Sequence, residues 1–283
     1  MSEKSCFILG MPEAGKTTFL AALWYCVNYS IDSILKLKAM DADLTYLSDI
    51  STKWSQAEQV SRTKLDFEKK EITLSLESKD GSLFKITFPD LSGETFQAQY
   101  EDREVTTYIA NYIKRSQGIL LFINPKKISE PNFISEVEPS IRDIASTSDH
   151  IERDPKSDDP TQVQLVELLQ FINYIREEQP VNLGIIISAW DVVEGNHEHK
   201  SDSPEEFVCK RLPLLWQYVA SNSKIFKMEY FGISAQGGEI SGNCDEILDI
   251  DDPCKRVIVV DNNNRSHDIT LPLFMVVNEL NEK

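Results

Sequence analysis

Two glycines five positions apart, followed at once by lysine and threonine, mark residues 10–17, Gly-Met-Pro-Glu-Ala-Gly-Lys-Thr. This segment follows the apolar run Cys6–Leu9 and precedes residues 16–29, whose apolar side chains recur at helical spacing. A GxxxxGK[ST] pattern in this setting, between a strand and a helix, is typical of a phosphate-binding loop. Successive backbone N–H groups face the phosphates, and the positive end of the helix dipole adds to their attraction.

Two residues of this loop have specific expected roles. Lys16 is expected to reach the β- and γ-phosphates, where it would act in catalysis, and Thr17 is expected to ligate Mg²⁺. The alternative is a glycine turn that carries an incidental lysine. The predicted nucleotide-binding residues of this segment are Pro12, Glu13, Ala14, Gly15, Lys16, Thr17 and Thr18.

Strand-like and helix-like segments alternate along the chain. Short apolar runs rich in β-branched residues predict buried strands at Cys6–Leu9, Gly118–Ile123, Leu183–Ser188 and Ile225–Ser234. Residues 71–79 and 83–88 alternate around Asp80-Gly81, which predicts a hairpin. Helical periodicity covers residues 16–29, 96–113, 161–176, 204–220 and 273–281. The expected fold is therefore α/β with three layers and a mostly parallel central sheet that includes one antiparallel hairpin strand.

Three segments do not fit this alternation, at about 31–70, 126–160 and 238–270. The first carries a helical pattern, and the second is acidic and interrupted by prolines. None of the three shows a core pattern of its own, so we interpret them as insertions. The expectation is a single domain over residues 1–283.

Composition narrows the possible partners and compartment. Lys and Arg number 29 and Asp and Glu number 46, which gives a net charge of −17 and disfavours nucleic acid and anionic membrane surfaces as partners. The five cysteines include no CxxC pair, so neither a disulfide framework nor a zinc site is expected. No apolar run approaches the ~20 residues of a membrane span. The expected location is the cytoplasm.

Asp90-Leu91-Ser92-Gly93-Glu94 follows the second strand of the expected hairpin. With this segment the sequence resembles the TRAFAC P-loop GTPases, the translation-factor and Ras-like class, whose DxxG motif occupies the same place. The resemblance implies a Ras-like G domain in which Asp90 holds Mg²⁺ through a water. It also implies that the Gly93 N–H contacts the γ-phosphate, so that hydrolysis releases the following segment.

Two further segments end predicted strands and resemble the base-reading motifs of the same class. In Ser188-Ala189-Trp190-Asp191 the carboxylate of Asp191 could accept from guanine N1–H and N2–H₂, a donor pair that adenine lacks. The alternative is a strand-ending Asp that caps the next turn. In Ser234-Ala235-Gln236 the resemblance implies that the Ala235 N–H meets guanine O6. All three residues of this segment are predicted nucleotide-binding residues, as are Gly93 and Asp191.

The candidate catalytic residues differ from those that are common in GTPases. Glu94 stands where GTPases commonly carry the glutamine that positions water, and its charge near phosphate predicts slow hydrolysis. Thr63, chosen ahead of Thr52, is the expected switch I threonine and a further Mg²⁺ ligand, although a solvated loop threonine is equally compatible. Arg62 is a candidate arginine finger in cis. The loop also resembles that of potassium-dependent GTPases, so Glu13 is a candidate to help hold K⁺.

The resemblance as a whole implies a Mg²⁺-dependent protein that binds GTP and GDP, hydrolyses GTP slowly and switches an unidentified protein partner, with a nucleotide-dependent dimer as an option. More narrowly, the loop, the DLSGE form and the long inserts resemble bacterial double-GTPase proteins of signalling and conflict systems. Two alternatives stay open. One is a P-loop ATPase, because Ala189 removes part of the guanine signature. The other is a catalytically weak, nucleotide-bound scaffold.

Overall fold

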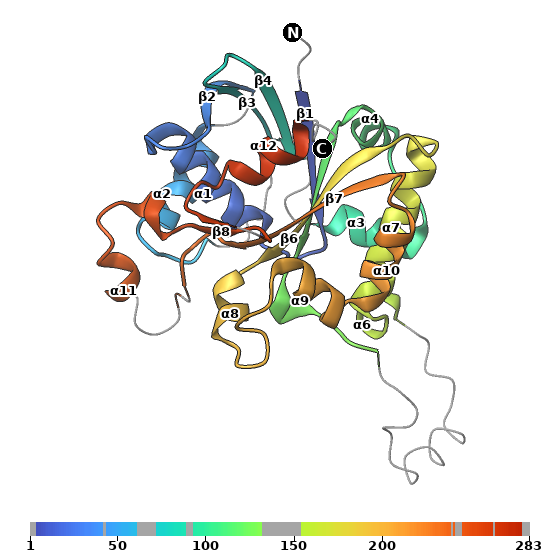
Figure 1. Cartoon of the computed structure of the whole chain (residues 1–283). Coiled ribbons are helices and arrows are strands. Elements are labelled where there is room, and N and C mark those ends of the chain that lie inside the picture. The colour runs from blue at the N-terminus through green and yellow to red at the C-terminus, as the bar shows by residue number, and fades with distance from the viewer. Residues whose placement is uncertain are drawn as a thin grey trace.

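The computed structural model describes residues 4–41, 44–60, 72–88, 93–131, 154–238, 240, 245–262 and 264–278. Its strands are β1 (Lys4–Gly10), β2 (Leu35–Asp41), β3 (Ile72–Ser78), β4 (Leu83–Phe88), β5 (Gly118–Ile123), β6 (Val181–Ser188), β7 (Phe226–Ser234), β8 (Ile258–Val260) and β9 (Arg265–Ser266). In the described residues these strands form one nine-stranded sheet in the order β2-β3-β4-β1-β5-β6-β7-β8-β9 (Figure 1).

The centre of the sheet is parallel and both of its edges are antiparallel. Strands β4, β1, β5, β6 and β7 pair in parallel, whereas β2, β3 and β4 pair antiparallel, as do β7, β8 and β9. This arrangement confirms the predicted α/β class and its early hairpin. Strands β2, β8 and β9 were not predicted, and they fall in segments that the sequence presents as insertions. Strands β8 and β9 are too short to give a clear sequence signal, and their pairing depends on neighbouring strands. Strand β2 has the alternation of a half-buried strand, but it lies in a segment interpreted as an insertion.

The helices lie on both faces of the sheet. They are α1 (Lys16–Tyr29), α2 (Leu44–Ser55), α3 (Glu94–Asp102), α4 (Thr107–Arg115), α6 (Pro155–Asp158), α7 (Thr161–Arg176), α8 (Trp190–Gly195), α9 (Pro204–Arg211), α10 (Pro213–Ser221), α11 (Asp245–Leu248) and α12 (Leu271–Val277), with short 3-10 turns η1 (Pro125–Lys127) and η3 (Pro253–Arg256). Among the described residues, none of these helices has the length and apolar composition needed to cross a membrane.

Two of the predicted helices are each divided in the structure. The helix expected over 96–113 becomes α3 and α4, because Arg103 adopts a left-handed conformation (φ 57°) and Thr106 caps the start of α4 by accepting from the Ile109 N–H. The helix expected over 204–220 becomes α9 and α10, because Pro213 has no N–H to continue the first helix. The last helix, expected over 273–281, is observed at Leu271–Val277.

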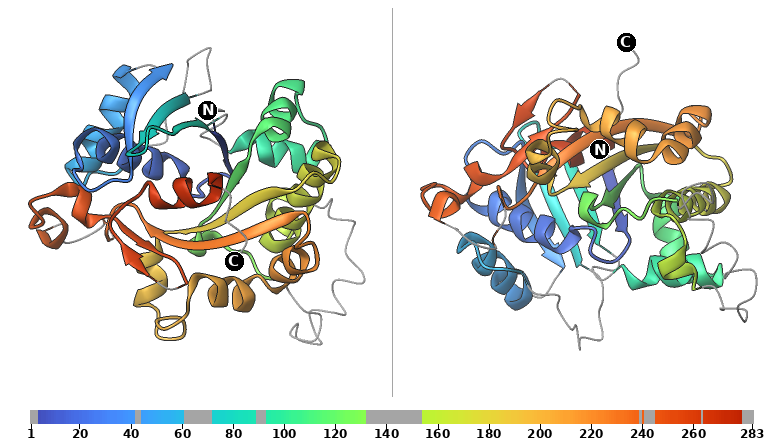
Figure 2. Two further views of the ribbon diagram at one scale, coloured as in Figure 1. Left: turned by 45° about the horizontal axis from the view of Figure 1, so that its top comes forward. Right: turned by 90° about the horizontal axis from the view of Figure 1, so that it is seen from below.

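Alternate residues of each central strand feed two separate cores. Along β1, Cys6 and Ile8 pack with α1, α2 and α12, while Phe7 and Leu9 pack with α3, α4 and α7 on the other face. Figure 2 shows α1 and α4 on opposite sides of the sheet. The period of two along a strand therefore produces the three predicted layers.

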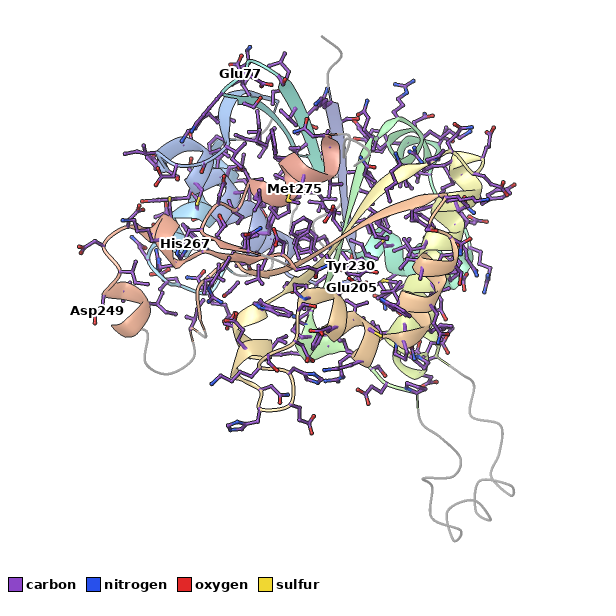
Figure 3. The ribbon with its side chains drawn as sticks, viewed as in Figure 1. Glu77, Glu205, Tyr230, Asp249, His267 and Met275 are labelled. Carbon is purple, nitrogen blue, oxygen red and sulfur yellow. The ribbon has the colours of Figure 1, made fainter. Side chains whose placement is uncertain are left out.

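Helix α9 packs across β7, which leads into one of the predicted base-reading segments. Figure 3 shows Tyr230 of β7 beside Glu205 of α9. Burial, together with the smaller effect of the Glu205 carboxylate, raises the pKa of the Tyr230 hydroxyl. Tyr230 is therefore neutral near pH 7.

Gly232 of β7 allows close contact with the ring of Trp190, which is 2% exposed. A Cβ added at Gly232 would lie 2.2 Å from Trp190 Cδ2. We expect Gly232→Ala to lower the free energy of unfolding by about 1–3 kcal/mol, because the indole must move within a packed core. Urea denaturation measures this loss. Gly195→Ala is the matched control, because an added Cβ there meets no atom of the described residues within 4 Å. Equal midpoints for the two variants would contradict the prediction.

Candidate nucleotide-binding site

The predicted site residues gather at the carboxyl ends of the parallel strands. Gly10 ends β1, Ser188 ends β6 and Ser234 ends β7, and Asn124 directly follows β5. In Figure 1 this edge of the sheet lies toward α8. Open α/β sheets bind their ligands at this edge.

Both glycines of the phosphate-binding motif are held closely by neighbouring strands. A Cβ added at Gly10 would lie 2.8 Å from the Phe122 carbonyl oxygen, and one added at Gly15 would lie 2.8 Å from Ser188 Cβ. Gly15 also adopts a left-handed conformation (φ 93°) as the N-cap of α1, where it offers no side chain to cap the helix. No side chain therefore caps the start of α1, and N–H groups at a helix N-terminus favour an anion.

The ammonium group of Lys16 lies inside the loop. Lys16 is 2% exposed, and its Nζ donates to the carbonyl oxygens of Gly10 at 2.6 Å and Met11 at 3.0 Å. Thr17 and Thr18 follow in the first turn of α1 and are half-buried. A positive charge beside a helix N-terminus is an arrangement that favours an anion.

Gly93 contacts the phosphate-binding loop directly. It is the N-cap of α3 and adopts a left-handed conformation (φ 81°). A Cβ added there would lie 2.6 Å from Met11 C and from Pro12 N. The structure therefore brings together two motifs that are separated in sequence by α1, β2, α2 and the β3–β4 hairpin. Asp90, which is in the same motif as Gly93, lies outside the described residues.

The outer side of the loop borders a cavity of about 370 Å³. Glu94, exposed at the start of α3, lines this cavity together with Glu13 and Lys127, and the Glu13 carboxylate forms an ion pair with the Lys127 ammonium. The Asn124 side-chain amide donates to the Glu13 carbonyl oxygen at 2.9 Å. Asn124 and Lys127 are not among the predicted site residues, although the position of Asn124 at the end of a parallel strand is a usable signal.

The two segments predicted to read the base also meet. The Ser234 hydroxyl donates to Asp191 Oδ1 at 2.6 Å and accepts from the Gly237 N–H at 3.2 Å. Ala189 has a left-handed conformation (φ 47°) and is the N-cap of α8, which places Asp191 in the first turn of that helix. The short Ala189 side chain stands where a long one is usual in this motif, as the sequence indicates.

The remaining predicted residues are placed less favourably or lie outside the described chain. Thr63 and Arg62 are both outside the described residues. Thr52, the second choice for switch I, is on α2, and its hydroxyl donates to the Ser48 carbonyl oxygen at 2.7 Å. This bond belongs to the helix itself, so nothing in the position of Thr52 supports a metal-binding role.

The fold and this site define a P-loop nucleotide-binding domain. A sequence profile of the Double-GTPase 1 family matches residues 7–276. The chain belongs to this family of P-loop GTPases, which confirms the narrower resemblance seen in the sequence to double-GTPase proteins.

Solved structures that resemble this chain are GTPase domains of low sequence identity. The GTP-bound GTPase-like domain of S. cerevisiae Ski7 is 13% identical with a TM-score of 0.48, and the match covers 99% of this chain and 51% of that one. Bacterial elongation factor EF-Sec is 14% identical with a TM-score of 0.39, and the match covers 90% and 28% of the two chains. The chain thus spans about half or less of these two proteins. Comparison with curated proteins gave no significant match.

Proposed function

We propose that the protein binds GTP and GDP with Mg²⁺, hydrolyses GTP slowly and acts as a nucleotide-controlled switch for a protein partner. The observation that carries this proposal is the contact of Gly93 with the backbone of Met11 and Pro12. A change at the γ-phosphate side of the loop would therefore move Gly93 and α3, which begins directly after Gly93. Membership of the double-GTPase family supports guanine as the base.

The Mg²⁺ ligands in this proposal are Thr17, Asp90 and Thr63. Hydroxyl and carboxylate oxygens are the donors that Mg²⁺ prefers, and Thr17 stands directly after the buried Lys16. When bound, the ion would neutralise charge that develops on the phosphates. The residues of this chain hold and orient the nucleotide through the loop backbone and Lys16.

Slow hydrolysis follows from the charges beside the loop. Glu94 brings a carboxylate to the side of the loop where water would attack, and the nearby Lys127 is already paired with Glu13. Lys16 is then the principal cation facing the phosphates. A potassium ion is a candidate to supply a further positive charge near Glu13, and equal turnover in potassium and sodium buffers would contradict that role.

Guanine preference tests the proposal most simply through Asp191. The Asp191 carboxylate can accept hydrogen bonds from both guanine N1–H and guanine N2–H₂. In Asp191→Asn the side-chain NH₂ is itself a donor, so it faces one of these guanine donors without forming a bond. We expect the variant to bind GDP about 10- to 100-fold more weakly and to gain affinity for xanthosine diphosphate, whose C2 carbonyl accepts from the amide. Displacement of a fluorescent nucleotide measures both affinities.

The matched control for this experiment is Asp80→Asn. Asp80 lies in the turn of the β3–β4 hairpin, where its carboxylate accepts from Ser82, and this variant should bind GDP as the wild type does. Wild-type protein that binds ADP as tightly as GDP would favour the ATPase alternative. Guanine binding without multiple-turnover phosphate release would favour the nucleotide-bound scaffold.

A further inference from the structure

Trp54 connects helix α2 with the loop that follows β7. It lies in the last turn of α2 and is fully buried. Its indole Nε1–H donates to the Ala235 carbonyl oxygen at 2.8 Å. Ala235 lies between Ser234, which is bonded to Asp191, and Gln236, so Trp54 reaches the middle of the base-reading segment.

Two further hydrogen bonds strengthen this contact, and in both of them the carbonyl oxygens of α2 are the acceptors. The Gln236 side-chain amide donates to the Trp54 carbonyl oxygen at 3.2 Å, and Arg256 Nη2 donates to the Ser55 carbonyl oxygen at 2.6 Å. These two carbonyls belong to the last residues of α2, whose partial negative charge favours a cation. The Arg256 guanidinium also lies 5.2 Å from the centre of the Trp54 ring.

Arg256 is built into this contact. It is 2% exposed, and burial lowers the pKa of its guanidinium, which nevertheless stays charged because its ordinary pKa is so high. Its backbone lies against the same loop, because a Cβ added at Gly237 (φ 88°) would be 2.6 Å from the Arg256 carbonyl oxygen. Residues 234–237 are thus held by α2 and η3 on one side and by Asp191 on the other.

We propose that Trp54 and Arg256 are positioning residues for purine recognition, holding the 234–237 loop so that it meets the base together with Asp191. This inference rests on the proposed guanine site and deepens it. Trp54 fixes the peptide that follows Ala235. The Ser234 hydroxyl fixes the end of the loop, because it accepts from the Gly237 N–H while it donates to Asp191. Loss of the indole bond gives Ala235 freedom that it must lose again when the base binds, which weakens binding of the correct base.

The deciding experiment compares Trp54→Phe with Trp216→Phe. Phenylalanine keeps an aromatic ring beside Arg256 but removes the bond to Ala235. Trp216 is partly buried and packs against the core on the opposite sheet face. Its indole Nε1–H donates to Glu205 at 3.3 Å, so its variant loses an indole bond elsewhere. The readout is the ratio of the ADP to the GDP dissociation constant. Thermal unfolding is recorded for each variant.

We expect Trp54→Phe to lower this ratio about three- to tenfold, mainly through weaker GDP binding, whereas Trp216→Phe leaves it at the wild-type value. A purely structural role would lower thermal stability and leave the ratio unchanged, and that result overturns the inference. Wild-type protein without guanine preference would instead refute the proposed function. If Trp54→Phe does not fold, Arg256→Lys decides the question, because it keeps the charge and loses the planar guanidinium. An unchanged ratio in that variant overturns the inference as well.

Discussion

Replacement of Lys16 by alanine should weaken GTP binding by at least about a thousandfold and abolish phosphate release. The ammonium is buried and donates to two loop carbonyls, at Gly10 and Met11, so the variant loses the principal cation of the site. It also leaves two carbonyl oxygens that repel an incoming phosphate. Charge-assisted hydrogen bonds in a water-poor site contribute more than neutral ones, which is why this effect should be large. Titration calorimetry with a non-hydrolysable GTP analogue measures it.

Lys114→Ala is the control for charge alone. Lys114 lies on α4 and forms an exposed ion pair with Glu177 at 2.9 Å. An exposed pair of this kind contributes little to stability. Lys114 is also remote in the fold from the phosphate-binding loop, so this variant should bind GTP as the wild type does. If Lys16→Ala and Lys114→Ala bound the analogue equally well, residues 10–17 would not be the phosphate site.

Replacement of Gly93 by alanine should damage both the fold and the site. Its φ of 81° disfavours any residue with a side chain, and the added Cβ would overlap Met11 C and Pro12 N at 2.6 Å. Backbone cannot move aside as a flexible side chain can, so the phosphate-binding loop must shift. We expect a loss of unfolding free energy of roughly 2–4 kcal/mol, from left-handed strain and overpacking together. GTP affinity should fall at least about a hundredfold.

Gly81→Ala separates the two causes. Gly81 has nearly the same φ, 82°, but an added Cβ there meets no atom of the described residues within 4 Å. This variant carries the backbone strain alone, so it should lose about 1–2 kcal/mol and keep its nucleotide affinity. Chemical denaturation and calorimetry on both variants give the comparison. Equal losses of stability and affinity in Gly93→Ala and Gly81→Ala would show that the Gly93 position is not in tight contact with the phosphate-binding loop.

The parts of the fold that the sequence predicts are those with a strong local signal. Continuous apolar runs identify the central strands, and the alternating segments around Asp80-Gly81 identify the hairpin. Strand β2 does carry a usable signal, because its leucines alternate with lysines as in a half-buried strand. It was not predicted because residues 31–70 were interpreted as an insertion. Strands β8 and β9 are two or three residues long, and such edge strands take their structure from the neighbour with which they pair.

The candidate site likewise has residues that local sequence patterns predict and one, Trp54, that they do not. The motifs around Lys16, Gly93, Asp191 and Ser234 are local patterns, and their positions at strand ends could be predicted from the order of elements. Trp54 could not be predicted as a neighbour of this site. It donates to a residue 181 positions away, and nothing in its helical surroundings distinguishes it from an ordinary core tryptophan.

The most direct measurement is a crystal structure of the protein with Mg²⁺ and a non-hydrolysable GTP analogue. We expect phosphates against the backbone N–H groups of residues 13–17 and the Lys16 ammonium. We also expect a guanine base whose N1–H and N2–H₂ donate to Asp191, beside Ser234 and Ala235. A loop without phosphate at saturating analogue, or an Asp191 carboxylate turned away from the base, would contradict this expectation.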